Sequence, residues 1–339
     1  MTEEHRLGLM SYGIYLPRGS ETAETIAALS GLAPDRLLGD WGIQKRPLPE
    51  AQDQPVSMAV KAACEAIRQA KSLQPEEIDV VIWTGEEYKD YIAQTAGIRV
   101  QEEVGAHRAW AFDLIGQGVT SLIGLRTAQD LMIGDPSVRT VLLAGGTRNC
   151  DLVDRTNPQT RWMLAASASG AALILRRGHP WNRLLATDFL VDSDMADEVY
   201  VPGGGTVHPF GVETLSPAMT HFQVSHPDKM SGYLSSRLPV RLTEVIQNVF
   251  SKAGFTGKAP DYLALRHLPP AQRRRVMAAL EIGEGNSDRL ADMGHHGPND
   301  VILSLDRAIR QGIVKTGSRV VLAAAGIGFT YGAALIQWG

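Results

Sequence analysis

The chain has 339 residues, of which 44% are hydrophobic, and it carries a formal net charge of -4. That length allows one large domain or two halves that share a core, and the composition is ordinary for a globular protein. The mixed charges form no basic stripe for nucleic acid, and no apolar run reaches the roughly 18 residues that a bilayer requires.

The first residues of the chain indicate where in the cell the protein is expected. Met1–Arg6 is charged and has no apolar core of the kind found in signal peptides. We therefore expect a cytoplasmic protein that binds neither nucleic acid nor membrane.

Helices and strands are predicted to alternate along the chain. Between them, Val191–Gln223 is rich in Gly, Pro and His and is expected to be a long surface loop. Asn299 or Asp300 is expected to cap the last helix. In chain order, the predicted helices are Pro55–Lys71, Val119–Met132, Leu242–Ala253, Pro270–Leu280 and Asp300–Gln311, and the predicted strands are Glu77–Thr84, Thr140–Gly146, Ser169–Leu175, Pro260–His267, Arg319–Gly326 and Tyr331–Trp338.

Part of this pattern occurs twice. The pair Thr140–Gly146 and Ser169–Leu175 reads like the pair Arg319–Gly326 and Tyr331–Trp338. In both pairs an apolar strand ends at glycine and a second apolar strand is entered through small residues, as in strands covered on both faces. We expect an α/β protein built from two similar halves, residues 1–178 and 179–339.

The two cysteines exclude a disulfide scaffold. Cys64 lies in the helix Pro55–Lys71 and is expected to be a small core residue, whereas Cys150 follows a strand and is expected to be inert. Neither cysteine has metal-ligand spacing, and the histidines form no ligand motif.

Four segments resemble a known family, and they occur in the order in which that family has them. They are Gly13–Pro17, Trp41–Arg46, Ala111–Leu114 and Gly326–Gly332. Together they resemble the thiolase superfamily, and in detail the ketoacyl-acyl-carrier-protein synthase III family. The resemblance implies a thiolase-like α/β fold in which two halves with mixed five-stranded sheets sandwich buried helices. It also implies a dimer supported by the segment Thr84–Arg108.

The same resemblance implies a catalytic Cys, His and Asn. Counted without a gap from Asp113, the family's cysteine falls on Gly118, its histidine on His267 and its asparagine on His295. The nucleophile is therefore missing, and a His/His pair remains to hold a thioester carbonyl or its enolate. The family's oxyanion hole corresponds to the backbone N–H groups of residue 118 and of Ile327, in the loop Gly326–Gly328.

Two neighbours of Gly118 could replace the thiol. Ser121, a turn into the helix, has no obvious base. Gln117 is similar to the glutamine that replaces cysteine in loading ketosynthases of polyketide assembly lines, which only decarboxylate. Gln117 stands one position early for that analogy, and we expect Gly118→Cys to restore acylation.

The resemblance also indicates how coenzyme A, which carries the acyl group in the family, would be bound. The tryptophan and arginine that hold the adenine of coenzyme A in well-studied members correspond to Arg36 and Gln159. A coenzyme A thioester or an acyl carrier protein would therefore be held differently here.

Three hypotheses remain. The first is a 3-oxoacyl-acyl-carrier-protein synthase III-like acyltransferase acting on acyl or malonyl thioesters, decarboxylation being one possible activity, with no resident cofactor or metal. The second is a non-catalytic subunit paired with a Cys-containing homologue, as a heterodimer rather than a homodimer. The third is an active ketoacyl synthase in which Gly118 has replaced a native cysteine.

Overall fold

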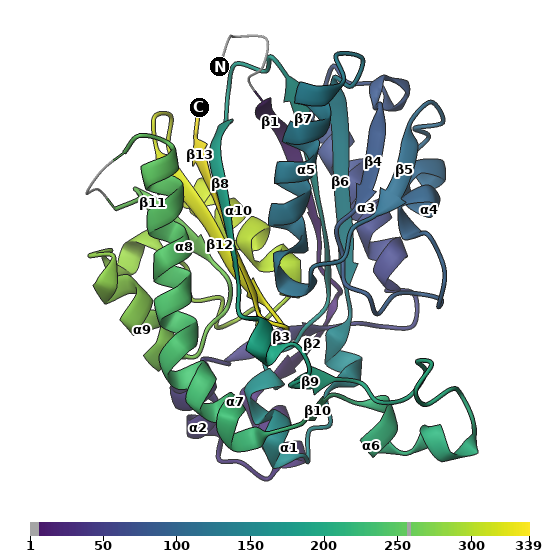
Figure 1. Ribbon diagram of the computed structural model, residues 1–339, viewed down its shortest axis with the longest axis vertical. Helices are drawn as coiled ribbons and strands as arrows, with labels where there is room; N and C mark the ends of the chain where they lie inside the picture. The colour runs from purple at the N-terminus through teal and green to yellow at the C-terminus, as the bar shows by residue number, and fades with distance from the viewer. Residues whose placement is uncertain (1–6, 256–258) are drawn as a thin grey trace.

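The computed structural model describes residues 7–255 and 259–339, so Met1–Arg6, on which the expected cytoplasmic location partly rests, lies outside the described residues. A mixed nine-stranded sheet has the order β11-β12-β13-β8-β1-β7-β6-β4-β5 (Figure 1). In that order the strands are Tyr262–Leu265, Arg319–Gly326, Thr330–Gln337, Arg183–Val191, Leu7–Tyr15, Ser169–Arg177, Thr140–Thr147, Val80–Trp83 and Trp110–Asp113.

The predicted duplication is visible in this order. β6 and β7 form an antiparallel pair in the first half, and β12 and β13 form the corresponding pair in the second. A parallel strand is added on the outer side of each pair, β4 beside β6 and β11 beside β12. The halves join where Gly8 of β1 pairs with Arg183 of β8, and the expected division at residue 178 falls in the turn between β7 and β8.

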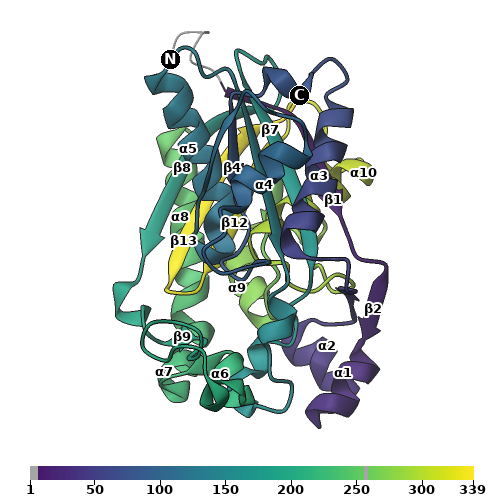
Figure 2. The same cartoon turned by 90° about the vertical axis from the view of Figure 1, so that its right-hand side faces the viewer.

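Helices cover both halves and fill the space between them. The ten α-helices of the described residues are α1 (Ala23–Ser30), α2 (Pro34–Trp41), α3 (Pro55–Gln69), α4 (Ala96–Glu103), α5 (Thr120–Gly134), α6 (Pro217–Thr220), α7 (Pro227–Gly232), α8 (Leu238–Lys252), α9 (Pro270–Ala279) and α10 (Asp300–Arg310). Figures 1 and 2 show α8 and α9 on one side of the molecule and α3 and α4 on the other.

Three apolar clusters correspond to these layers. One joins α3 and α4 to the first half of the sheet, and another joins α8 and α9 to the second half. The third surrounds α5 and α10, and α5 contacts both β6 and β13. The result is a five-layered α/β body with two buried central helices, as predicted. Within the described residues, no helix is long and apolar enough to cross a membrane.

The structure corrects three expectations. The second half contributes four strands within the described residues, because the segment beyond β11 is polar and glycine-rich and forms a 3-10 turn, Glu284–Asn286, instead of a fifth strand. Neither candidate side chain caps α10, since Asn299 donates instead to Gly145 and Ser169. Cys64 is exposed rather than in the core, because the buried face of α3 runs through other positions.

The expected surface loop Val191–Gln223 is mostly irregular. It contains only two-residue β9 (Val199–Tyr200), 3-10 turns and the short α6. β9 pairs with β10 (Gln223–Val224), and β2 (Gly19–Thr22) pairs with β3 (Lys45–Leu48). Figure 2 shows these small ribbons gathered with α1, α2, α6 and α7 at one end of the molecule.

Candidate active site

The elbow after β5 is built by two anchored side chains. At its start, Asp113 accepts hydrogen bonds from the backbone N–H groups of Ala96 and Gly97 at the N-terminus of α4 (3.0 and 2.8 Å). At its end, the Thr120 hydroxyl accepts from the Gly116 N–H (3.0 Å) and donates to the Gln117 carbonyl (2.6 Å). These contacts fix the chain as it turns from the strand into α5.

The residue at the point of the elbow is Gln117. It has φ +52°, in the left-handed region that few non-glycine residues adopt, and it opens the 3-10 turn Gln117–Val119. Such strain is commonly found where a turn presents a side chain for function. Gln117, which the ungapped count places one position early, thus occupies the conformation expected of an elbow residue.

Gly118 has no room for a side chain. A Cβ atom built on it would lie 2.6 Å from the carbonyl oxygen of Ala325, a backbone atom that cannot simply rotate away. The crowding disfavours our expectation that Gly118→Cys restores acylation. It equally disfavours the hypothesis that Gly118 replaced a native cysteine, because that thiol would have needed the space that Ala325 fills.

The elbow opens into a small cavity, which we call the inner cavity, with a volume of about 70 Å³ for the centres of water-sized molecules. Most of its polar side chains come from loops at the ends of β4, β5, β6 and β11 and from the turn before α10, and Gln272 comes from α9. The lining residues on which the site depends are Glu86, Gln117, Gly118, Asn149, Arg266, His267, His295, Gly326 and Ile327. Of the site residues predicted from the sequence, only Gly328 does not line this cavity.

His295 is held between a carboxylate and a guanidinium. Its Nδ1 lies 2.5 Å from Oδ2 of Asp300, and its Nε2 lies 3.0 Å from Nη2 of Arg266. Because a guanidinium can only donate, Nε2 must accept, and the proton of the ring is on Nδ1, facing Asp300. Nε2 is therefore not a free donor for a substrate oxygen in this structure.

Asp300 is the buried anchor of this group. It also accepts from the backbone N–H groups of His267 (2.8 Å) and His296 (2.6 Å). Burial alone would raise the pKa of the Asp300 carboxyl, but the attraction and hydrogen bonds of the histidines hold it below its ordinary value. Asp300 thus stays charged and balances the buried charge of Arg266.

His267 faces the cavity as a neutral ring. Its Nε2 donates to the carbonyl of Gly42 (3.3 Å), and burial lowers the pKa of His267 to about 4. The rings of His267 and His295 lie 6.4 Å apart, so the expected pair does come together. With Nε2–H engaged by Gly42, the free ring nitrogen of His267 is an acceptor.

Sequence reasoning missed two charged side chains of the cavity. Arg266 donates to the carbonyl of Ala325 (2.7 Å) as well as to His295, and Glu86 brings a buried carboxyl from the loop after β4. Arg266 could have been predicted as a site residue from its place at the end of an apolar strand, because a charged side chain is rarely buried without a role. Glu86 stands beside Glu87 in a polar run, and nothing in that run distinguishes it.

Other candidates lie outside the cavity. Ser121 is buried in the first turn of α5 and does not line the cavity, and its hydroxyl has no hydrogen-bond partner among the residues that the structure describes. Cys150 is also buried, and burial raises the pKa of its thiol to about 12, as suits an inert residue. Residues 7–255 and 259–339 contain no cluster of three or more His, Cys, Asp or Glu side chains able to hold a metal ion.

A second hollow, which we call the outer pocket, adjoins the inner cavity. The two share Trp162, Leu234 and Gln272 in their walls. Arg36 and Gln159, which the resemblance matches to the family's coenzyme A positions, line the outer pocket. Trp41 and Arg161 line it too, and buried N–H groups of Arg161 and Trp162 have no partner within the described residues.

Comparisons with known proteins agree with this architecture. Residues 250–338 match the family model "3-Oxoacyl-[acyl-carrier-protein (ACP)] synthase III C terminal". The chain is 26% identical to the beta-ketoacyl-[acyl-carrier-protein] synthase III of Synechocystis sp. over 98% of both chains. It is 29% identical to the enzyme of that name from Brucella suis over 88% of both chains.

Solved structures show the same fold. The 3-oxoacyl-[acyl-carrier-protein] synthase III from Aquifex aeolicus superposes with a TM-score of 0.84 at 19% identity, covering 98% of this chain and all of the other. The priming beta-ketosynthase from the R1128 polyketide biosynthetic pathway gives 0.83 at 18% identity, with 98% and 96% covered. The fold is thiolase-like, and the chain is similar to the ketoacyl-acyl-carrier-protein synthase III family, whose C-terminal model its residues 250–338 match.

Proposed function

We propose that the protein removes carbon dioxide from a malonyl-type thioester without forming an acyl-enzyme. The observation that carries the proposal is Gln117 at the strained point of the elbow, with no room for a nucleophile at Gly118. An amide at that point can hydrogen-bond a bound acyl group but cannot be acylated by it. The substrate is then held non-covalently throughout.

The buried charge of Arg266 suits this reaction. When the bond to the carboxylate carbon breaks, its electron pair moves into the thioester, and negative charge develops on the carbonyl oxygen. Arg266 supplies a fixed positive charge in a poorly solvated cavity, where such charge stabilises an enolate far more than in water. The N–H groups of Gly118 and Ile327 are the further donors that the resemblance to the family implies.

The carrier of the substrate is coenzyme A or an acyl carrier protein, as the names of the relatives suggest. Its arm would pass through the outer pocket, where Trp41 and Trp162 offer aromatic surface and Arg161 an unpartnered N–H. Arg36 lines this pocket too, and a phosphate group there would compete with Asp40, with which Arg36 forms an ion pair (2.7 Å).

The test uses malonyl coenzyme A and a malonyl acyl carrier protein with the wild-type chain. We expect time-dependent release of carbon dioxide and formation of the acetyl thioester, with no increase in the mass of the protein. Gln117→Ala should lower the rate by at least about tenfold, since one lost donor typically costs 10²–10³ in rate. The exposed Gln311→Ala serves as the matched control and should leave the rate unchanged.

Two results would contradict the proposal. An acyl adduct mapped to the elbow peptide would show that a covalent intermediate does form. Failure to release carbon dioxide from either carrier would favour the non-catalytic subunit, a second function supported by the missing nucleophile and by the exposed edge of β5.

A further inference from the structure

Glu86 is a buried carboxylic acid for which the reaction described so far has no use. It follows β4 and is only 3% exposed. Its backbone is fixed on both sides, since its N–H donates to the carbonyl of Gly146 and its carbonyl accepts from Nε1 of Trp83, each at 3.3 Å. The side chain is therefore placed by a rigid segment of the sheet.

The Glu86 side chain lines the inner cavity. Oε1 lies over Gly297, where a Cβ atom would come within 2.2 Å of it, and the φ of +54° at Gly297 also favours glycine there. Gly297 starts the 3-10 turn Gly297–Asn299, which directly follows His295 and His296 and packs against the elbow turn Gln117–Val119. Oε2 is buried and has no hydrogen-bond partner within the described residues.

The surroundings of Glu86 keep it protonated near neutral pH. Burial is the largest effect and raises its pKa to about 8; the charges of Asp300 and Glu87 act in the same direction, and Arg266 opposes them. A neutral carboxylic acid with an unpartnered oxygen thus faces the substrate cavity.

The ring hydrogens of the two cavity histidines are committed. The Nδ1–H of His295 faces Asp300, and the Nε2–H of His267 faces Gly42. An arginine side chain stays protonated in proteins, so Arg266 cannot act as an acid. Among the described lining residues with side-chain protons, Glu86 is the one whose proton is both acidic and free.

We propose that Glu86 donates a proton to the α-carbon of the enolate that decarboxylation leaves. In a condensing enzyme that carbon would attack an acyl-enzyme, whereas here it has no acyl partner and must be protonated. The α-carbon gains a C–H bond, the O–H bond of Glu86 breaks, and the carboxylate then takes a proton from water. The net reaction converts the malonyl thioester and one proton into the acetyl thioester and carbon dioxide.

This inference rests on the proposed function, and the experiment separates the two. Methylmalonyl coenzyme A is decarboxylated in D₂O, and the configuration of the deuterated propionyl product is determined. In parallel, propionyl coenzyme A alone is incubated in D₂O, and exchange of its α-hydrogens is followed by mass spectrometry. In this exchange a proton leaves the α-carbon and a deuteron returns to it, so the transfer between Glu86 and the α-carbon is measured in both directions without any decarboxylation.

Wild-type protein should give one product configuration and measurable exchange. Glu86→Gln should slow exchange at least tenfold and give mixed configurations, Glu86→Asp should recover part of both, and the exposed neighbour Glu87→Gln should match wild type. Circular dichroism confirms that each variant is folded.

Each outcome decides a separate point. Unchanged exchange and configuration in Glu86→Gln would overturn the role of Glu86, even if carbon dioxide is released. Glu86-dependent exchange without any release of carbon dioxide would support the role of Glu86 and overturn decarboxylation.

Discussion

His295, Asp300 and Arg266 form a chain in which one neutral ring separates two buried charges. Asp300 compensates Arg266 at a distance, so a cation can remain in the cavity without a direct ion pair. A guanidinium in contact with a carboxylate would have its field largely cancelled at the substrate. With His295 between them, the field of Arg266 remains available to a developing enolate.

Glu86 should leave a signature in the pH dependence of stability. Its pKa is about 8 when folded against an ordinary 4.5, so between these values the folded protein holds a proton that the unfolded chain has released. Raising the pH through this window therefore favours unfolding, by roughly 1.4 kcal/mol per pH unit from this group.

Urea unfolding at several pH values should show this slope as the difference between wild type and Glu86→Gln. The difference should level off below pH 4.5 and above pH 8. Glu87→Gln should retain the wild-type slope. Parallel curves for wild type and Glu86→Gln would mean that Glu86 is already ionised in the folded protein.

A pair of cysteine variants tests which residue occupies the elbow. Gln117→Cys replaces a side chain that already fits, whereas Gly118→Cys forces a Cβ atom against Ala325 and should cost about 1–3 kcal/mol, as overpacked sites do. Both are made in a Cys64→Ser background, because Cys64 is exposed.

The measurements are thermal melting and intact mass after incubation with an acyl coenzyme A. We expect Gln117→Cys to melt near wild type and gain one acyl group, and Gly118→Cys to melt lower and stay unmodified. Faster acylation of Gly118→Cys than of Gln117→Cys would contradict this expectation. It would support the ungapped count from Asp113, which assigns the family's cysteine position to Gly118.

At the level of elements, the sequence predicted what periodicity and glycine turns encode. The first apolar pair forms β6 and β7, and the second forms β12 and β13. The similarity of the two pairs in sequence predicted two similar halves. The pairs are Thr140–Gly146 with Ser169–Leu175, and Arg319–Gly326 with Tyr331–Trp338. Each has enough apolar residues to be covered on both faces, so local pattern and tertiary position agree.

The elbow could not be predicted to one residue. Counting from Asp113 assumes a fixed path through residues 114–116, but Thr120 pulls Gly116 and Gln117 back toward α5 and decides which residue takes the positive φ. The partners of Arg266 were equally hidden, because His295 and Ala325 lie far from it along the chain. Such contacts depend on tertiary structure rather than on local sequence.

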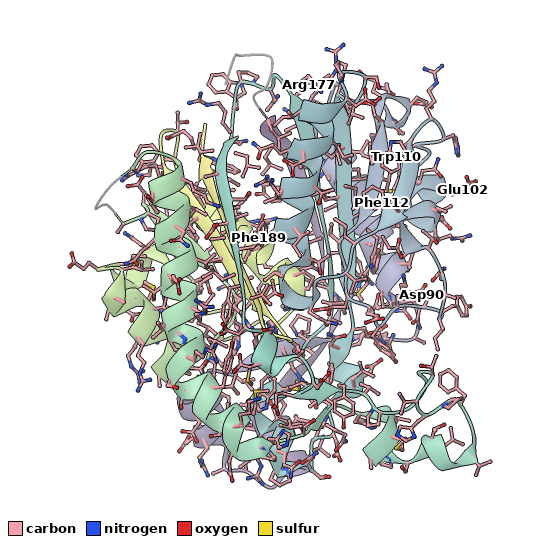
Figure 3. All side chains as sticks on the ribbon, viewed as in Figure 1. Asp90, Glu102, Trp110, Phe112, Arg177 and Phe189 are labelled. Atoms are coloured by element: carbon pink, nitrogen blue, oxygen red, sulfur yellow. The ribbon has the colours of Figure 1, made fainter. Side chains whose placement is uncertain are left out.

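For the molecule as a whole, the sheet ends in two edge strands, β11 and β5, and β5 carries exposed aromatic side chains. Trp110 and Phe112 lie on this edge strand with their rings stacked, 5.0 Å between centroids (Figure 3). Trp110 is 51% exposed, and Tyr91 and Ile92 of the preceding loop are 73% and 70% exposed. An edge strand flanked by exposed apolar side chains is usually covered by a partner.

We therefore predict a dimer through the region of Thr84–Arg108 and β5, with more than about 2,000 Å² buried. Light scattering at micromolar concentration should give twice the chain mass. Trp110→Glu should shift the protein toward monomer, because it places a charge in the apolar contact. Trp181→Glu, at a tryptophan exposed to 56% on the turn between β7 and β8, is the matched control.

A wild-type protein that is monomeric under these conditions would exclude this interface. A mixed dimer that forms only with a Cys-containing homologue would support the non-catalytic subunit instead.

The strands also give the molecule a polarity with a practical consequence. Glu86, Gln117, Arg266 and Ile327 all follow the carboxyl ends of strands, so the reaction cavity opens at that end of the sheet. The chain finishes at the opposite end, where Gly339 is tied to Asn182 beyond β13 (Figure 1). A carrier domain fused behind Gly339 would need a linker long enough to travel the full length of the body, whereas an affinity tag placed there stays clear of the mouth.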